Sequence, residues 1–293
     1  RLQMALVALQ EQLPPPFPVI SSMHNDMQQR SSIHVLYRGS EDHPRQAVGM
    51  RVLGVFLPDR VAPLAADMPQ PKTQLARWIT DPDNPLTARV IVNRLWQYHY
   101  GHGLVRTAND FGANGDRPSH PELLDFLANE LIDRGWELKQ IHRMLLSSRV
   151  FRQSSRVSQT RESIRQDPEN RLLARYSRRR LHAEELRDAM LTASGQLHLV
   201  DGGPSVIAEV DQELIDLLYK PAQWKVSAKP SDQARRSIYL IAKRNLRLPF
   251  MEVFDQPDLQ TSCAKREAST HAPQVLEMLN GHLTNALASA FAD

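Results

Sequence analysis

The chain has 293 residues, of which 41% are hydrophobic and 24% are charged, a composition that excludes a collagen, a coiled-coil rod and a wholly disordered chain. A total of 36 Lys and Arg against 33 Asp and Glu leaves a formal net charge of +3, so no nucleic acid is expected as a partner. No apolar run approaches the roughly 20 residues of a transmembrane helix. The one cysteine, Cys263, excludes an internal disulfide, a Cys-rich zinc site and a covalently attached haem, and we expect no cofactor in this chain.

The first 70 residues are predicted to form an extended or β segment that leads into a linker. Residues 2–13 favour a short helix, which stops at the prolines of 14–16. Residues 33–37 and 52–57 are short β-prone runs bounded by turn formers, and they predict a small paired sheet. Prolines then recur up to residue 71 and indicate the linker.

Residues 71–293 are predicted to be mainly α-helical, either as a separate domain or continuous with the first 70 residues. In one helix Asn84 is expected as the N-cap, with Pro85 at the first helical position and a stop at Gly101. Another helix is expected to start from a capping box at residues 119–122. Further helices are predicted over 72–80, 138–148, 170–176, 182–194, 249–254 and 273–290. A later strand and a polar hinge are predicted over 237–241 and 152–168, respectively.

One face of the helix predicted over 84–100 carries groups that suit carbohydrate recognition. They fall within a stripe of about 100° and are Arg89, Asn93, Trp96, Gln97 and Tyr100. A guanidinium, an amide and an indole together can hydrogen-bond hydroxyl groups and stack on a sugar ring. The alternative is that these side chains satisfy loop carbonyl groups beside the helix. In both cases Ile91, Leu95 and Tyr98 on the opposite side are expected to supply the core contact.

Four residues form a candidate metal site: His99, His102, Asp110 and His120. Neutral imidazoles and a carboxylate suit a hydrolytic metal ion such as zinc. However, residues 101–118 separate members of the set, and no motif of known spacing fixes their geometry. The absence of a metal site is therefore the alternative.

Five arginines make the densest basic run of the chain. They are Arg171, Arg175, Arg178, Arg179 and Arg180. Guanidinium groups bind phosphate and sulfate in a bidentate manner, which makes the last three candidates for binding an anionic ligand. The next predicted helix carries His182, Glu184, Glu185 and Asp188. At that spacing the carboxylates are interpreted as a solvent-exposed helix face, and their pairing with the arginines is the alternative to ligand binding.

Several motifs resemble the planctomycete secreted domain 1 family, domain of unknown function 1553. Residues 75–97 read LARWITDPDNPLTARVIVNRLWQ, and residues 118–125 read PSHPELLD. Residues 236–239, SIY preceded by Arg, and residues 243–245, KRN, follow in the family order, as does a T-x-x-P-Q-x-L-x-x-L-N motif over 270–280. The resemblance covers most of residues 30–285, although residues 114–117 depart from the family pattern.

The resemblance implies an extracytoplasmic protein, secreted or in the cell envelope, that is part of a longer chain with further domains upstream. Genes of the family commonly lie next to genes of sulfatase-like proteins. The resemblance therefore associates this chain with envelope polysaccharide. The leading hypothesis is therefore a domain that binds an anionic polysaccharide or a partner protein. The alternatives are a hydrolase, metal-assisted in one version, and a structural scaffold for the upstream domains.

Overall fold

A computed structural model describes residues 30–54, 62–156, 165–216, 218 and 220–292. The helix predicted over residues 2–13 lies outside these ranges. The chain divides into two units, Arg1–Asn84 and Pro85–Asp293, and each is described by itself. The predicted division after residue 70 and the predicted hinge over 152–168 stay predictions.

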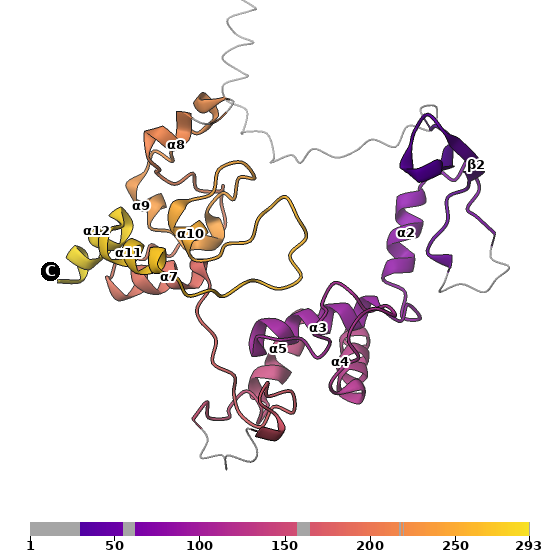
Figure 1. The fold of residues 1–293 in the computed structure, drawn as a ribbon, viewed down its shortest axis with the longest axis horizontal. Coiled ribbons are helices and arrows are strands. Elements are labelled where there is room, and N and C mark those ends of the chain that lie inside the picture. The colour runs from indigo at the N-terminus through magenta and orange to yellow at the C-terminus, as the bar shows by residue number, and fades with distance from the viewer. Residues whose placement is uncertain (1–29, 55–61, 157–164, 217, 219, 293) are drawn as a thin grey trace, which may run out of the picture. The chain divides into compact units, whose positions relative to one another are not determined.

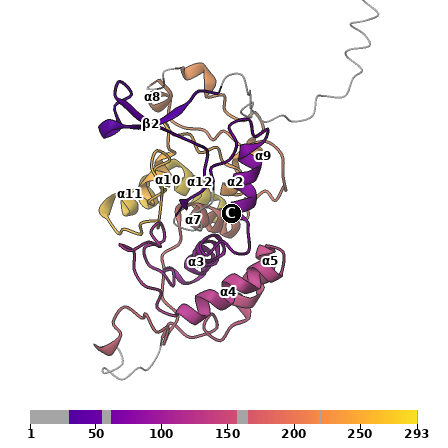
Figure 2. The same cartoon turned by 90° about the vertical axis from the view of Figure 1, so that its right-hand side faces the viewer.

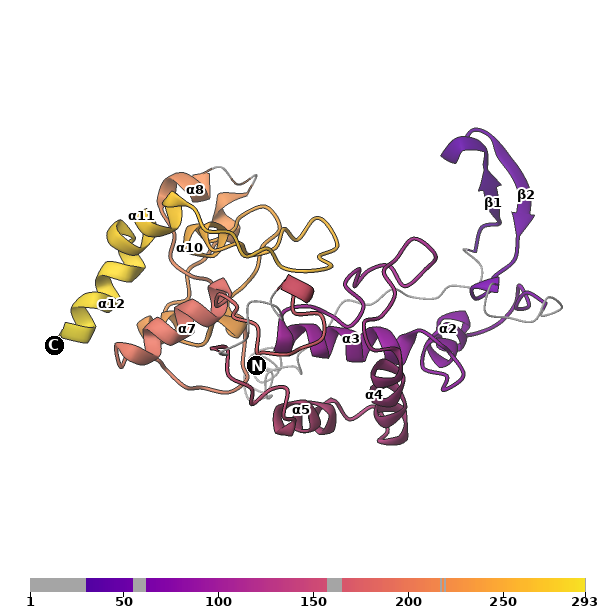
Figure 3. The same ribbon diagram turned by 60° about the horizontal axis from the view of Figure 1, so that its bottom comes forward.

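The first unit contains a β-hairpin. Strand β1 (Ile33–Leu36) pairs antiparallel with β2 (Pro44–Val48), so that Ile33 lies opposite Val48 (Figure 3). The first predicted strand is confirmed, but its partner is β2 and not 52–57: residues 52–54 are not in a strand, and 55–57 lie outside the described residues. The loop 37–43 joins β1 directly to this closer partner, and Tyr37 N–H donates to His43 O across it at 3.1 Å.

Helix α2 (Pro71–Ile79) completes the first unit and confirms the helix predicted over 72–80. Pro71 stands at its first position, where the missing N–H has no intrahelical partner to lose. Asn84 follows, and it is not in the N-cap position of the next helix, which begins at Thr87 with Leu86 as its N-cap. Its Nδ2 donates to Trp78 O at 3.2 Å, so its side chain is engaged with the end of α2.

The second unit begins with three helices around one hydrophobic core. They are α3 (Thr87–Tyr100), α4 (Pro121–Asp133) and α5 (Leu138–Ser147), which pack against one another (Figure 2). Val92, Leu131 and Ile141 lie fully buried at their meeting point. Helix α3 ends at Gly101 in the left-handed conformation, as predicted, because glycine adopts a φ of 84° without strain. The predicted capping box at 119–122 does not form: His120 is the N-cap of α4 and makes no side-chain cap.

The rest of the second unit contains α7 (Ala183–Ala193), α8 (Gln212–Asp216), α9 (Pro230–Gln233), α10 (Pro249–Val253), α11 (Ala272–Asn280) and α12 (His282–Ala292). Helix α7 packs against α10 and α12, and α10 against α11 (Figure 1). Ala183, Phe250, Met251 and Phe254 form a small core at this contact. A second small core gathers Leu218, Trp224 and Leu246.

In this part of the chain, three predicted elements differ from the observed structure. Residues 170–176 are not helical, because Asn170 and Leu173 have φ values of 54° and 58° and break the helical path. Residues 237–241 form a 3₁₀ turn (Ser237–Tyr239), after which Leu240 makes an isolated bridge to Val206. The helix predicted over 273–290 is two helices, divided at Gly281.

The architecture is mainly α with a small sheet near the N-terminus, as predicted. Within the described residues, no helix combines the length and the apolar character that crossing a membrane requires.

Candidate functional site

Three residues of the predicted carbohydrate-binding stripe belong to the core. The exposed fractions of Asn93, Trp96 and Tyr100 are 0%, 4% and 6%. Asn93 holds the loop after α3: its Nδ2 donates to Val105 O, and its Oδ1 accepts the N–H of Val105, both at 2.9 Å. The Tyr100 hydroxyl donates to Leu145 O at 3.2 Å. Their placement agrees with the alternative in which the stripe residues contact the chain itself and not a carbohydrate.

The other two stripe residues make intramolecular contacts at the surface of α3. Arg89 Nε lies 2.6 Å from Asp125 Oδ1, and Gln97 Nε2 donates to Ala264 O at 3.1 Å. Tyr98, predicted to face the core, has an exposed fraction of 62%. Leu95 is buried and Ile91 packs against the same core, as predicted, so of the three residues expected to face the core only Tyr98 does not.

The structure does not bring the four candidate metal ligands together. His99 Nε2 lies 2.8 Å from His142 Nδ1, and His102 Nε2 lies 3.3 Å from Lys265 Nζ. Asp110 Oδ1 accepts a backbone N–H from Gly112, and the His120 ring contacts Ser119. No group of three or more His, Cys, Asp or Glu side chains suited to a metal ion occurs in the part of the chain that the structure describes.

Two of the three candidate arginines make ion pairs within the chain. Arg179 binds both carboxylate oxygens of Glu185, at 2.8 and 2.9 Å. Arg180 lies 2.6 Å from Asp255 Oδ2 and also donates to Ser269 O at 2.8 Å. Arg178 is exposed. The pairing predicted from the sequence thus accounts for Arg179, whereas the partner of Arg180, Asp255, lies outside the predicted set.

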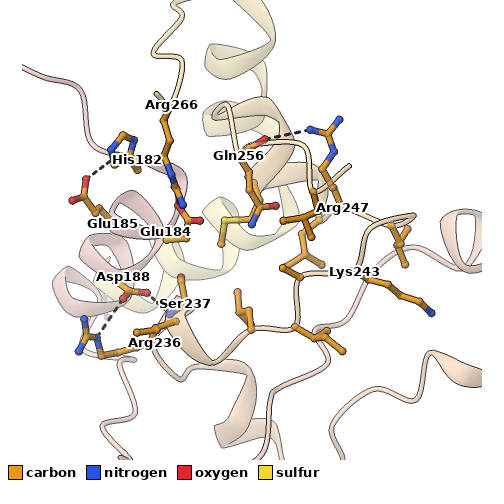
Figure 4. Close-up of a pocket in the computed structure, with 18 of the residues that line it drawn as sticks. His182, Glu184, Glu185, Asp188, Arg236, Ser237, Lys243, Arg247, Gln256 and Arg266 are labelled. Atoms are coloured by element: carbon orange, nitrogen blue, oxygen red, sulfur yellow. Dashed lines mark hydrogen bonds and ion pairs between the residues drawn. The ribbon is translucent and has the colours of Figure 1, made fainter. Parts of the chain in front are cut away.

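Charged residues of α7 instead line a cavity of about 430 Å³, here called the α7 cavity (Figure 4). Helix α7 contributes Glu184, Glu185 and Asp188, and its N-cap residue is His182, which also lines the cavity. Across the cavity lie Arg247 and Gln256, and Arg266 reaches Glu184 from a separate loop. Apolar side chains complete the wall, among them Ile241, Leu246, Leu248 and Met251.

The first turn of α7 fixes two of these carboxylates. Glu185 Oε2 accepts the backbone N–H of His182 at 2.9 Å, which closes a capping box. The hydrogen bonds from Arg179 hold the pKa of Glu185 below its usual value. Burial alone would raise the pKa of Glu184, but Arg266, at 2.6 Å, brings it below the usual value. Both carboxylates therefore stay ionised near neutral pH.

Asp188 and a buried arginine tie α7 to the opposite wall of the cavity. Asp188 Oδ1 accepts the N–H of Ser237 at 2.7 Å, and Arg236 Nε lies 3.5 Å from Oδ2. Arg187, 5% exposed, donates to Arg235 O at 2.9 Å and to the hydroxyl of Ser237 at 3.2 Å. These bonds hold the 3₁₀ turn Ser237–Tyr239 beside α7 and give the cavity a fixed wall.

The α7 cavity lies inside the region that matches a known family. The sequence model described as "Protein of unknown function (DUF1553)", PSD1, matches residues 71–293. The chain belongs to the PSD1 family. No curated protein and no solved structure matches it. The resemblance that the motifs indicate is thereby confirmed for most of the chain.

The α7 cavity of this PSD1 chain combines hydrogen-bond acceptors, hydrogen-bond donors and apolar surface. Ionised Glu184 and Glu185 are acceptors, and the guanidinium groups of Arg247 and Arg266 are donors. Burial, followed by the charge of Arg266, lowers the pKa of His182, so its imidazole is neutral near pH 7. The cavity can thus exchange hydrogen bonds with a ligand that both donates and accepts.

The sequence indicated the α7 residues but suggested another role for them. Their helical spacing predicted a solvent-exposed face, whereas Glu184, Glu185 and Asp188 are only partly exposed. The signal that would have found the cavity is the set of basic residues that flank the predicted strand 237–241, because Arg236, Lys243 and Arg247 line it. The partner of Glu184 could not be found in this way, because Arg266 lies 82 positions away.

Proposed function

We propose that this PSD1 chain is a binding domain and that the α7 cavity holds the hydroxyl groups of a short saccharide. The observation that carries the proposal is the alternation of ionised carboxylates and guanidinium groups around an apolar wall. A sugar hydroxyl both donates and accepts, so it can bridge a carboxylate and a guanidinium group. The apolar wall suits the C–H face of a sugar ring, and a cavity of about 430 Å³ falls in the size range of small-ligand sites.

The charge state of the cavity favours binding over hydrolysis of a glycosidic bond. The usual mechanism of that reaction requires a carboxylic acid that protonates the leaving oxygen. Arg266 and Arg179 hold the pKa values of Glu184 and Glu185 low, so neither carboxyl group carries a proton to donate near neutral pH. Two ionised carboxylates can accept hydrogen bonds from a ligand, which is what a binding role requires of them.

The wider setting of the proposal comes from the family resemblance. An extracytoplasmic location, envelope polysaccharide as the ligand and upstream domains as partners are what that resemblance implies, and they stay predictions. A candidate surface for a partner protein lies on α11, where the apolar side chains of Val275, Leu276, Met278 and Leu279 are exposed.

The proposal is tested with the purified chain and a panel of neutral, sulfated and uronate oligosaccharides. A ligand that binds the folded state raises the melting temperature, and calorimetry then gives the affinity. Gln256→Ala removes an amide from the α7 cavity without breaking any side-chain bond to the described residues, and it should weaken binding by about tenfold. The matched control is Gln196→Ala, an exposed glutamine outside the cavity. No stabilisation by any saccharide, or equal affinities for the two variants, would contradict the proposal.

A further inference from the structure

A second cavity of about 390 Å³ adjoins the α7 cavity. The two share part of their walls, including Glu184, Gln256 and Arg266. The second cavity adds residues of α3 and of the loop before α11, among them Arg94 and Lys265. A ligand seated in one cavity can therefore extend into the other across the Glu184–Arg266 pair.

Two cations of the second cavity have neutral partners. Arg94 donates to the Asn109 amide oxygen at 2.6 Å, and Lys265 Nζ lies 3.3 Å from His102 Nε2. Neither cation lies within ion-pair distance of a carboxylate among the described residues. Other arginines of the same unit, such as Arg179 and Arg180, are paired with carboxylates.

The acidic side chains of the second cavity are already engaged. Glu184 pairs with Arg266, and Asp258 accepts the backbone N–H of Gln260 at 2.9 Å. Asp258 keeps its own charge, so the three cations and two carboxylates of the wall leave it with a net charge of +1. His102, next to Lys265, has a pKa below its usual value because of burial and then of the Lys265 charge, as expected where the local potential is positive.

We propose that the second cavity binds the acidic group, sulfate or carboxylate, of the saccharide whose hydroxyl groups occupy the α7 cavity. A guanidinium fork and an ammonium group are the groups that bind such oxyanions. The proposal rests on the proposed function in one respect, that a single ligand occupies both cavities. It adds the site of the charged group and the two residues, Arg94 and Lys265, that select for it.

Cys263 supplies a direct test of occupancy. It lines the second cavity, it is exposed, and it is the one cysteine of the chain, so alkylation by neutral N-ethylmaleimide reports on this place alone. We expect sulfated or uronate oligosaccharides to slow the alkylation several-fold and the neutral counterpart to leave it unchanged. Comparing the sulfated with the uronate ligand identifies the acidic group. Sodium sulfate is measured against sodium chloride at equal ionic strength to separate binding from screening.

The variant Lys265→Gln tests the selecting residue. It should weaken binding of the acidic oligosaccharide about five- to tenfold and leave the neutral one unchanged, and Arg94→Gln should act in the same direction. The matched control is Lys139→Gln, an exposed lysine of α5 outside both cavities, which should change neither affinity.

The outcomes separate the two proposals. Equal affinity for neutral and acidic saccharides, with unprotected Cys263, would overturn the acidic site and keep the saccharide-binding function. If no saccharide binds but inorganic sulfate protects Cys263 in a Lys265-dependent manner, the anion site stands and the saccharide function fails. Protection by neither sulfate nor saccharides would overturn the acidic site.

Discussion

Glu184 and Arg266 lie 82 positions apart in the sequence and form an ion pair of 2.6 Å in the wall that the two cavities share. The pair joins α7 to the loop before α11. It also decides the charge that each cavity presents, because the charge of Arg266 without Glu184 would raise the net positive charge of the second cavity. Removing the carboxylate of Glu184 is therefore expected to change the affinities for neutral and for acidic saccharides in opposite directions.

Glu184→Gln should weaken neutral saccharides several-fold, since an ionised acceptor is lost, and strengthen acidic ones, since Arg266 is released. The variant should also lose about 1 kcal/mol of unfolding free energy, the scale of a partly exposed charge-assisted hydrogen bond. Calorimetric titration and urea unfolding measure the two effects. Glu209→Gln, at an exposed glutamate, should show neither. A parallel change for both ligands would show that the pair does not set the selectivity.

Arg187→Met should destabilise the chain by about 3 kcal/mol. Arg187 is buried, and it donates to Arg235 O, to the Ser237 hydroxyl and to Gln233 O. The apolar side chain leaves these acceptors without a donor, and each buried unsatisfied group costs about 1–3 kcal/mol. Urea unfolding measures the loss. The matched change Arg143→Met, at an exposed arginine of α5, should stay within about 0.5 kcal/mol, and a loss below 1 kcal/mol for Arg187→Met would contradict the assignment.

The elements that could be predicted from the sequence are those with local causes. Helix α7 is marked by apolar spacing and by the reach of Glu185 back to His182, three residues away. Residues 170–176 have a helical composition, yet Asn170 adopts a positive φ because its side chain holds the later loop through Arg175 O at 2.8 Å. Such a contact depends on the folded loop and leaves no periodic signal.

The candidate site shows the same limit. A helical wheel gives the two faces of α3 but not which face meets the core. Asn93 of the polar face is buried because it holds the loop at Val105, whereas Tyr98 of the opposite face is left exposed. Both cavities depend on residues far apart in sequence, and no spacing within one helix reveals them.

Asn93→Ala should lower the unfolding free energy by about 3 kcal/mol, because it removes two buried hydrogen bonds and leaves both backbone groups of Val105 unpaired. Saccharide affinity of the protein that remains folded should not change, since Asn93 lines neither cavity. Asn129→Ala, at an exposed position of α4, is the matched control. A stable Asn93→Ala protein that has lost saccharide binding would restore Asn93 to the role predicted from the sequence.

Acidification should begin to destabilise the chain as the pH falls below about 6.5. Burial lowers the pKa values of His99, His102 and His182 below the ordinary 6.5, helped by His142, Lys265 and Arg266 in turn. As the pH falls through 6.5, the unfolded chain therefore binds protons before the folded chain does. The unfolding free energy decreases as the pH falls. Glu184 and Glu185, whose folded pKa values lie below 4.5, add their loss only at lower pH. Urea unfolding at pH 7.5 and 5.5 measures the first step.

His99 is the residue that separates this explanation from general acid sensitivity. Its Nε2 lies 2.8 Å from His142 Nδ1, and burial, followed by the charge of His142, lowers the pKa of His99. His99→Gln should reduce the difference in unfolding free energy between pH 7.5 and 5.5, whereas His198→Gln, at an exposed histidine, should leave it unchanged. Stability that is constant or higher at pH 5.5 in the unmodified chain would refute the assignment of histidines with lowered pKa values.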